Sequence, residues 1–228
     1  MPSQKKRPLM SRRNFLELAA AAALTLAGMA ALVGTWSRPA HAQGTVVPTD
    51  QLMAEQALPD IVQGKADAPV TIVEYASMTC SHCAAFHAMT YPTLVSKYVD
   101  TGKVRFILRE FPLDPLATAA FMLARCSGPQ KRNAVVDLLF DHQKDWAFTD
   151  KPLEALSNLL KQTGMTQASF ETCINDQSLY EKVTSERDQA SQKFGIEATP
   201  MFFINGRKIS GEISPDALDK LLDPLLKK

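Results

Sequence analysis

Cys80 and Cys83, two cysteines separated by two residues, are the side chains of this sequence best suited to chemistry. Thiols at this spacing can form a redox disulfide, supply half of a zinc site, attach a haem or form an inert structural bond. Haem attachment requires a histidine directly after the second cysteine, where this sequence has Ala84. The spacing favours a redox pair and keeps a metal site as the main alternative.

A zinc site made of four cysteines would need a second closely spaced pair, but Cys126 and Cys173 lie far apart in the sequence. A mixed site could instead combine the first two cysteines with His82, His87 or His142. His82 lies between those cysteines, a position from which it cannot easily join both in one tetrahedron. We therefore expect no metal, and a metal-binding module stays the alternative from a different functional class.

The residues around the two cysteines predict a strand, a short turn and then a helix. Val70–Tyr75 is an apolar, largely β-branched run typical of a buried strand, and Ala84–Met89 favours helix. This order places Cys80 at the helix N-terminus, where unpaired N–H groups and the helix dipole favour negative charge. A thiol there, beside a histidine, ionises near neutral pH. The thiolate is the nucleophile of disulfide exchange and also its better leaving group.

The stretch Val70–Phe86, together with Thr199-Pro200 far downstream, resembles the thioredoxin superfamily. The C-x-H-C pattern, Glu74 six residues before the first cysteine and a long helical insertion resemble the α-proteobacterial branch of the DsbA thiol-disulfide oxidoreductases. The resemblance covers roughly residues 58–228. It implies an α/β architecture, a thioredoxin fold with an inserted all-helical domain.

Each residue of the C-x-H-C pattern has an expected role. Cys80 is expected to be the exposed nucleophile that forms mixed disulfides with substrates, and Cys83, one helical turn later, to resolve them. His82 is expected to stabilise the Cys80 thiolate, which makes the disulfide a stronger oxidant. Ser81 replaces the proline often found in DsbA proteins. Its hydroxyl can donate to the thiolate, so we expect this residue to tune the redox potential.

Three further residues complete the expected site. Glu74 lies on the apolar strand, where a buried carboxylate needs a purpose or a partner and its charged form is disfavoured. The resemblance implies that it carries a proton to or from Cys83. The resemblance also implies that the peptide bond before Pro200 is cis, packed beside Cys80, so that a substrate strand pairs with the Thr199 backbone. Thr199 replaces the valine common in enteric DsbA proteins, a difference that we expect to tune substrate affinity.

Two other pairs of residues lie outside this set. Cys126 and Cys173 fall near the ends of predicted helices, and we interpret them as a structural disulfide that restrains the unfolded chain by about 4 kcal/mol. Two separate buried thiols are the alternative. Met78 and Met201 either line a hydrophobic groove beside Cys80 or belong to the core.

Hydrophobic periodicity predicts the domains. Residues 43–66 are expected to be a linker, or to begin a short helix at Thr49 or Asp50, with an edge strand at 58–62. Residues 67–112 and 191–228 are expected to form the thioredoxin-fold domain. Residues 113–190 contain no good strand and predict the inserted helical domain. Its helices are expected at 116–126, 133–146, 152–162, 167–174 and 178–194.

Within the thioredoxin-fold part, we expect the helix after Cys80 to run from Ser81 to about Tyr98, with a kink at Pro92. His87 is interpreted as a semi-buried histidine of this helix. A strand is expected at residues 104–111, a hairpin at Asn205-Gly206 and a final helix from residue 215, which Pro224 kinks or ends.

The N-terminus is typical of an export signal. Ser11–Leu16 resembles the twin-arginine consensus, an apolar run follows over Ala19–Trp36, and Ala40-His41-Ala42 fits a cleavage site. We expect residues 1–42 to be a signal removed after Ala42, with an uncleaved membrane anchor as the alternative. Export would bring the protein to a Gram-negative periplasm, a compartment that tolerates disulfides.

Composition and charge argue against a nucleic-acid-binding protein. The chain has 228 residues, of which 46% are hydrophobic, enough for one sizeable core. Its formal net charge is +1. Before residue 43 the chain has six basic residues and one acidic residue, whereas the remainder has 19 basic and 23 acidic residues. No basic surface for nucleic acid is therefore expected.

These observations predict a periplasmic thiol-disulfide oxidoreductase that donates the Cys80–Cys83 disulfide to exported proteins bearing reduced cysteines. We expect a monomer without a cofactor, and the resemblance implies reoxidation by a membrane quinone-linked protein resembling DsbB. A disulfide isomerase or reductase is the alternative within the same class. Isomerases of this superfamily usually carry an N-terminal dimerisation domain, for which residues 43–60 are too short.

Overall fold

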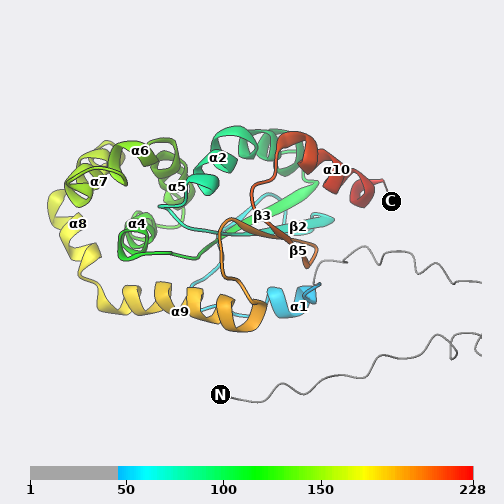
Figure 1. Cartoon of the computed structure of the whole chain (residues 1–228), viewed down its shortest axis with the longest axis horizontal. Helices are drawn as coiled ribbons and strands as arrows, with labels where there is room; N and C mark the ends of the chain where they lie inside the picture. Colours follow the sequence, from blue (N-terminus) through cyan, green and yellow to red (C-terminus); the bar gives the residue numbers. More distant parts are fainter. Residues whose placement is uncertain (1–45, 228) are drawn as a thin grey trace, which may run out of the picture. The chain divides into compact units, whose positions relative to one another are not determined.

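A five-stranded sheet with the strand order β1-β3-β2-β4-β5 forms the centre of the fold (Figure 1). The computed structural model describes residues 46–227, and the predicted export signal lies outside the described residues. Strands β2 and β3 are parallel, and the other neighbouring pairs are antiparallel. The strands have the bounds β1 Val62–Gln63, β2 Val70–Ala76, β3 Val104–Glu110, β4 Met201–Ile204 and β5 Arg207–Ser210.

Helices cover both faces of the sheet. Figure 1 shows α2 and α10 over one face and α9 and α1 over the other. The α-helices have the bounds α1 Thr49–Leu52, α2 Ser81–Met89, α3 Tyr91–Leu94, α4 Pro115–Cys126, α5 Arg132–Asp141, α6 Gln143–Trp146, α7 Pro152–Leu160, α8 Gln167–Ile174, α9 Gln177–Phe194 and α10 Pro215–Leu226. A π-helical turn, η2 (Val95–Val99), follows α3, and a 3-10 turn, η3 (Lys161–Thr163), follows α7. None of the helices in the described range is long and apolar enough to cross a membrane.

The central strand β2 is buried at every residue, as its continuous apolar composition predicts. Because side chains alternate along a strand, Ile72 and Ala76 join the hydrophobic cluster on one face of the sheet. Val73 and Tyr75 join a second cluster, which includes Phe194 of α9. Glu74 shares the face of Ile72 and Ala76, which α2 covers.

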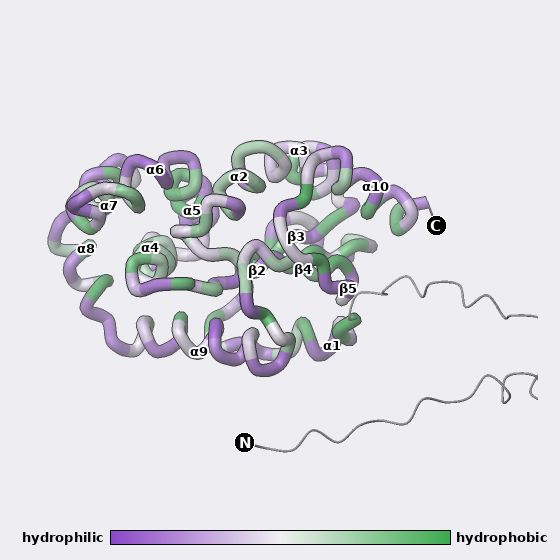
Figure 2. The backbone as a smooth tube through the Cα atoms, viewed as in Figure 1, coloured by the Kyte–Doolittle hydropathy of each residue, from purple (hydrophilic) through white to green (hydrophobic). Residues whose placement is uncertain are grey.

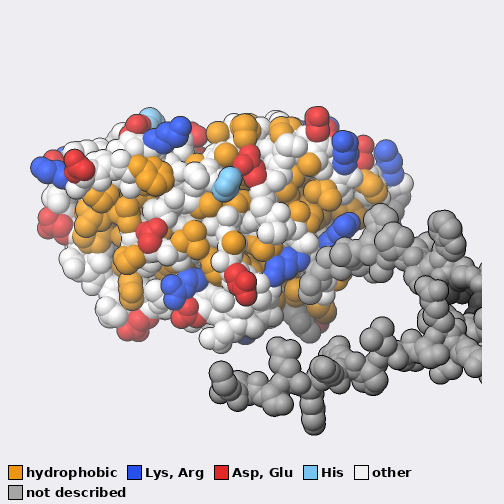
Figure 3. All heavy atoms as spheres, viewed as in Figure 1, with side chains coloured by type: hydrophobic (Ala, Val, Ile, Leu, Met, Phe, Trp, Pro, Cys, Tyr) orange, Lys and Arg blue, Asp and Glu red, His pale blue; other side chains and the backbone are white. Residues whose placement is uncertain are grey.

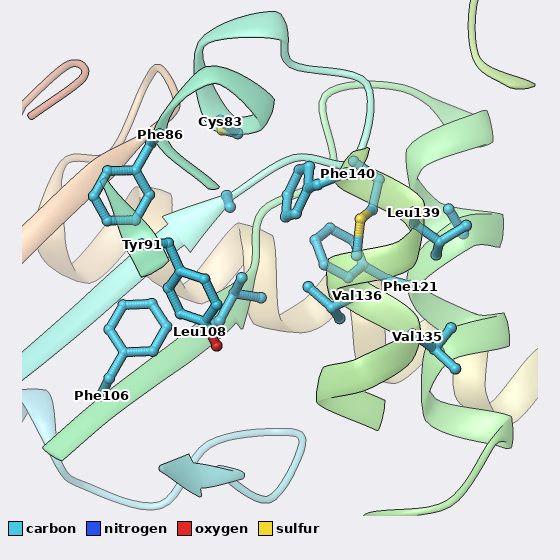
Figure 4. Packing of buried hydrophobic residues seen from close by; sticks show 14 of the residues in the cluster. Cys83, Phe86, Tyr91, Phe106, Leu108, Phe121, Val135, Val136, Leu139 and Phe140 are labelled. Carbon is cyan, nitrogen blue, oxygen red and sulfur yellow. The ribbon is translucent and has the colours of Figure 1, made fainter. Parts of the chain in front are cut away.

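Helices α4 to α8 are inserted between β3 and the return of the chain through α9 to β4. One hydrophobic cluster continues from the sheet into these helices and includes Leu108 of β3, Phe121 of α4 and Leu139 of α5 (Figure 4). The outer helix α9 is largely hydrophilic (Figure 2). The predicted α/β architecture with a helical insertion is confirmed, whereas the exact domain boundaries stay a prediction.

The helix that follows Cys80 is shorter than predicted. It ends at Met89, and a second helix, α3, begins at Tyr91 with Pro92 in its first turn. Proline has no N–H to donate to the preceding turn, so a new helix start accommodates it better than a kink inside one long helix. The hydroxyl of Thr90, at the break, donates to the carbonyl oxygen of Ile213 at 2.7 Å and ties this point to the loop before α10.

Three other predicted elements also differ from the structure. The predicted strand at 58–62 is reduced to Val62–Gln63, paired with β3 at the sheet edge, because Pro59 cannot donate in a ladder. The predicted helix at 133–146 breaks at His142 into α5 and α6. Pro224 does not end α10, which continues to Leu226; it is exposed, where water can bond the freed carbonyl.

The predicted hairpin at Asn205-Gly206 is confirmed. It joins β4 to β5, which pair in an antiparallel register. Asn205 has φ 45° and Gly206 has φ 82°, so both residues adopt the positive φ that a tight two-residue hairpin requires. A Cβ atom on residue 206 would lie 2.0 Å from the carbonyl oxygen of Val47, so only glycine fits there.

Candidate active site

The local sequence places Cys80 at the carboxyl end of β2 and directly before α2. Its backbone N–H donates to the carbonyl oxygen of Ser77 at 3.1 Å, which closes the turn between strand and helix. The hydroxyl of Thr79 donates to the carboxylate of Asp114 at 2.5 Å and connects this turn to the start of α4. The predicted order of strand, turn and helix is therefore observed.

The two thiols of the pair have opposite environments. Cys80 is half-buried, Cys83 is fully buried, and both are free thiols in the structure. A hydrogen bond from the Cys83 thiol, aided by Thr199 and by the backbone N–H groups of Cys83 and His82, lowers the pKa of Cys80 to about 5 against the opposing effect of burial. Burial raises the pKa of Cys83 well above its ordinary value, and the contact with Cys80 and the charge of Glu74 raise it further.

The peptide bond between Thr199 and Pro200 is cis and directly precedes β4. The Cys80 thiol donates to the carbonyl oxygen of Thr199 at 3.3 Å, so this loop lies against the helix N-terminus. The hydroxyl oxygen of Thr199 is buried and has no hydrogen-bond partner among the described residues. It is therefore free to interact with the sulfur when Cys80 ionises.

His82 and Ser81 are both exposed at the start of α2. The imidazole of His82 is 73% exposed, and its Nδ1 lies 3.4 Å from Oε2 of Glu212. The contribution of His82 to the low pKa of Cys80 comes from its backbone N–H. A role of the imidazole in stabilising the thiolate, and of the Ser81 hydroxyl in tuning the potential, stays a prediction.

Glu74 is completely buried on β2. Its Oε2 lies 3.0 Å from Nε2 of His87, a residue of α2 that is also buried. The sequence predicts His87 to be a semi-buried helix histidine, with a metal ligand as the alternative, and does not pair it with Glu74. Its position four residues after Cys83, on the helix face that meets the sheet, is the signal that could have paired it with Glu74.

Gln143 is a second residue of the site that the sequence analysis missed. Its side-chain amide donates to the carbonyl oxygens of Met78 and Cys80 at 2.8 and 3.0 Å. Gln143 begins α6, so this contact joins the inserted helices to the turn that carries Cys80. No local sequence pattern identifies such a residue, because its partners lie more than sixty positions away.

Of the two alternatives for Met78 and Met201, groove wall or core, the structure shows the core. Met78 is 0% exposed and Met201 is 5% exposed, so both belong to the core. Leu113 and Phe148 are large hydrophobic side chains that are exposed, by 50% and 62%. Figure 3 shows several patches of hydrophobic side chains on one face of the molecule.

Cys126 and Cys173 form a disulfide with an S–S distance of 2.06 Å. It joins the last residue of α4 to the penultimate residue of α8, within the inserted helices. In the described range, no cluster of three or more histidine, cysteine or acidic side chains is arranged to hold a metal. The exposed His82 contacts Glu212, and the buried His87 contacts Glu74. This arrangement does not favour the metal-binding module.

Comparisons with known proteins agree with this geometry. The profile of the family described as Thioredoxin matches residues 56–224. A Rickettsia bellii protein named as a protein-disulfide oxidoreductase is 32% identical over 148 residues, which are 64% of this chain and 57% of that protein. A Rickettsia felis protein of the same name is 31% identical over 172 residues, 74% of this chain and 61% of that protein. The chain thus spans about three fifths of the length of these relatives.

The solved structures include a neighbour that is similar over nearly its whole length. Wolbachia pipientis alpha-DsbA1 is 31% identical, with 78% of this chain and 95% of that chain covered and a TM-score of 0.71. The predicted thioredoxin fold with a helical insertion is thereby confirmed. Together, the family match, these relatives and the C-x-H-C turn beside a cis-proline loop lead to one conclusion: the chain belongs to the DsbA family of thiol-disulfide oxidoreductases, within the thioredoxin superfamily.

Proposed function

We propose that the protein oxidises pairs of cysteines in exported proteins, donating its Cys80–Cys83 disulfide through a mixed disulfide at Cys80. The observation that carries this proposal is the contrast between the two thiols. The half-buried Cys80 has its pKa lowered to about 5, whereas the pKa of the buried Cys83 is raised. A disulfide whose reduced form contains a stabilised thiolate is a strong oxidant, because stabilising the reduced form raises the reduction potential of the pair.

The proposed reaction has two exchange steps. A substrate thiolate attacks Sγ of Cys80, the Cys80–Cys83 bond breaks, and Cys83 leaves with the electron pair and takes up a proton. A second substrate thiolate then attacks the substrate sulfur of the mixed disulfide, and Cys80 leaves as a stable thiolate. Two electrons have passed to the protein, and the substrate has gained one disulfide.

Neighbouring residues have roles in these steps. The buried Glu74 supplies the proton that Cys83 takes up and accepts it again on reoxidation. The Thr199 backbone, with its carbonyl 3.3 Å from the Cys80 sulfur, offers a substrate strand a place to pair. His82 and Ser81 adjust the stability of the thiolate. Cys126–Cys173 is a structural bond outside the reaction.

The proposal includes the compartment and the partners. We infer that residues 1–42 direct the protein to the periplasm, where the substrates are exported proteins bearing reduced cysteines. A membrane quinone-linked protein resembling DsbB would accept the two electrons and restore the disulfide. The protein acts as a monomer, without a cofactor or nucleic acid.

The equilibrium of the purified protein with glutathione buffers tests the proposal. The fraction of oxidised pair is scored by alkylation of Cys80 and Cys83, with a Cys80→Ser variant to identify the labelled thiol. An oxidase stays reduced in buffers in which much of the glutathione is oxidised. A pair that stays oxidised in strongly reducing buffer would overturn the proposal in favour of a reductase.

A second assay separates an oxidase from an isomerase. A peptide with two reduced cysteines is mixed with the oxidised protein, and the peptide disulfide is measured over time. An oxidase forms this bond stoichiometrically without added thiol. An isomerase instead reshuffles the mispaired disulfides of a misfolded test protein faster than it oxidises the peptide.

A further inference from the structure

His87 is a buried histidine of α2 for which the proposed reaction has no role so far. Its side chain is 3% exposed, and its Nε2 lies 3.0 Å from Oε2 of Glu74. The ring is stacked on Phe140, with centroids 4.2 Å apart, and packs against Tyr91 at 4.6 Å. Figure 4 shows Tyr91 over the sheet and Phe140 on α5. The imidazole therefore keeps one orientation, with Nε2 toward Glu74.

The outer atoms of this pair lack partners. Oε1 of Glu74 and Nδ1 of His87 are both buried and have no hydrogen-bond partner among the described residues. A buried polar atom without a partner destabilises the folded state, so native structures rarely keep one without a reason. Here each end of a hydrogen-bonded pair has one free atom. A chain that passes protons requires such free positions at both of its ends.

A pocket of about 370 Å³ reaches the His87 ring from the surface. Its lining includes Tyr91, Asp137 and Asp141 as well as His87. Oδ1 of Asp137 lies 3.9 Å from Nδ1 of His87, and this carboxylate is 43% exposed. Neither Cys80 nor Thr199 lines this pocket, so it gives solvent a separate approach to the pair behind the reactive thiols.

We propose that His87 is the positioning residue that passes protons between Glu74 and this pocket, so that the buried Cys83 gains and loses its proton through the pair. The proposal rests on the proposed oxidase function and extends it to one further residue. Asp137 is the group at the entrance that exchanges protons with solvent.

The proton balance is complete in both half-reactions. When Cys83 leaves as a thiolate, Glu74 gives it a proton, Nε2 of His87 gives its proton to Glu74, and Nδ1 takes one from the pocket. When the protein is reoxidised, Cys83 returns a proton to Glu74, Nε2 accepts it, and Nδ1 releases one to Asp137 or water. The second half-reaction restores the original tautomer, so the ring does not need to rotate between turnovers.

The charged groups around His87 suit this role. Glu74 faces the ring from β2. The packed helix α5 contributes Asp137, Asp141 and Arg132, and α3 contributes Tyr91. Burial raises the pKa of Asp137 to about 6, although nearby His87 opposes the shift. This carboxyl is therefore ionised above about pH 6 and can then accept the proton that Nδ1 releases.

The test measures the step in which Cys83 must lose a proton. The reduced full chain reacts with glutathione disulfide: the Cys80 thiolate forms a mixed disulfide and releases one glutathione. Cys83 then attacks Cys80 and releases the second. In a His87→Gln variant, we expect the second release to slow about tenfold or more. The first release and the pKa of Cys80 should stay unchanged. The amide can still donate to Glu74 but cannot pass a proton.

Asp137→Asn is the second variant, because Asp137 is half-exposed and its replacement does not disturb the core. In the unmodified protein, the rate of the second release should increase as pH rises through about 6, where Asp137 ionises. Asp137→Asn should abolish this increase. His142→Gln and Asp145→Asn are matched controls, since this exposed pair has a similar contact, Nδ1 to Oδ2 at 3.0 Å, and neither lines the His87 pocket nor lies on α2. Near-ultraviolet circular dichroism establishes that each variant is folded, and Asp137→Asn decides if His87→Gln does not fold.

The outcomes separate this inference from the proposed function. If the unmodified protein does not oxidise a two-cysteine peptide, the proposed function fails whatever the variants do. If it does, but the second step in both site variants equals that in both controls at every pH, His87 is only structural and the inference alone is overturned. Slowing of both release steps alike would also overturn it, because that result indicates general damage to the site.

Discussion

The sulfur of Cys80 lies 3.3 Å from the carbonyl oxygen of Thr199, although these residues are 119 positions apart in the sequence. This contact joins the N-terminus of α2 to the cis-proline loop before β4. The Thr199 carbonyl accepts a hydrogen bond from this sulfur, whereas the Cys83 thiol and the backbone N–H groups of Cys83 and His82 can donate to it. Its chemistry depends on which of these neighbours donates a hydrogen bond to the thiolate.

The Cys83 thiol is the strongest of these donors, so its removal should make Cys80 a weaker acid. We expect Cys83→Ala to raise the pKa of Cys80 by about 1–2 units, since a hydrogen bond to a charged group contributes about 1.5–3 kcal/mol. The ultraviolet absorbance of the thiolate, followed against pH, measures this shift. Cys83→Ser keeps a donor and should shift the pKa less. Equal values in the alanine variant and the reduced unmodified protein would show that Cys83 does not stabilise the thiolate.

The low pKa of Cys80 also predicts how the stability of the reduced protein depends on pH. The thiol has a pKa of about 5 when folded and about 9.0 when unfolded, so the unfolded state binds more protons between these values. The free energy of unfolding should therefore rise from about pH 5 to pH 9, and this gain is lost progressively as pH falls from 9 toward 5. Urea unfolding of the reduced protein at several pH values measures the slope.

Cys80→Ala supplies the control for this stability prediction. The variant lacks the titrating thiol, so its free energy of unfolding should rise less with pH over the same range. The high pKa of Cys83 acts above about pH 9 and does not affect this comparison. A slope that is identical in the variant and the reduced parent would contradict the predicted linkage.

The elements that carry the reactive pair could be predicted because their signals are local. An apolar run, two spaced cysteines and a helix-favouring segment define β2, the turn and α2 within twenty residues. The helix break at Thr90 was missed because a proline that could kink a helix could equally begin a new one. In the structure the Thr90 hydroxyl at the break donates to the carbonyl oxygen of Ile213, a partner far along the chain that no local pattern indicates.

The polar partners of the site could not be predicted, because they depend on tertiary contacts. Glu74 was expected to be buried, but nothing local shows that His87 contacts it. In the sequence, Gln143 looks like an ordinary residue of an amphipathic helix. Arg109 looks like an outward-facing polar residue of a strand with one exposed face. In the structure Arg109 is buried and forms a two-contact ion pair with Asp60 at 2.7 and 2.8 Å. Arg109 is buried because both faces of β3 are covered around it.

Gln143 should be required for the geometry of the Cys80 turn. In Gln143→Ala, the carbonyl oxygens of Met78 and Cys80 lose their shared donor, which should cost about 1–3 kcal/mol of folding stability. Amide hydrogen exchange in the turn should accelerate, and chemical unfolding gives the loss of stability. Gln177→Ala is the matched control, because that glutamine is exposed and bonds only to Glu181 of its own helix. Equal effects of the two substitutions would show that Gln143 does not hold the turn.

Glu110 should be the acidic residue whose loss destabilises the protein most. It ends β3 and accepts hydrogen bonds from Arg125 of α4 and Arg132 of α5 at 2.7–2.9 Å, which joins the sheet to the inserted helices. In Glu110→Gln the buried guanidinium of Arg132 keeps its charge without a counter-ion. We expect a loss of about 3–5 kcal/mol in the free energy of unfolding, measured by urea denaturation.

The pH dependence of that loss distinguishes a buried ion pair from simple packing. Burial would raise the pKa of Glu110, but Arg132 and Arg125 overcome it and lower the pKa to about 2. Its contribution is therefore complete above about pH 4.5 and disappears as pH falls toward 2. The difference between Glu110→Gln and the unmodified protein should shrink over that range. Glu154→Gln removes an exposed carboxylate beside Lys151 and should change stability by less than about 1 kcal/mol at any pH. A Glu110→Gln deficit that does not vary with pH would mean that shape, rather than charge, is what this site requires.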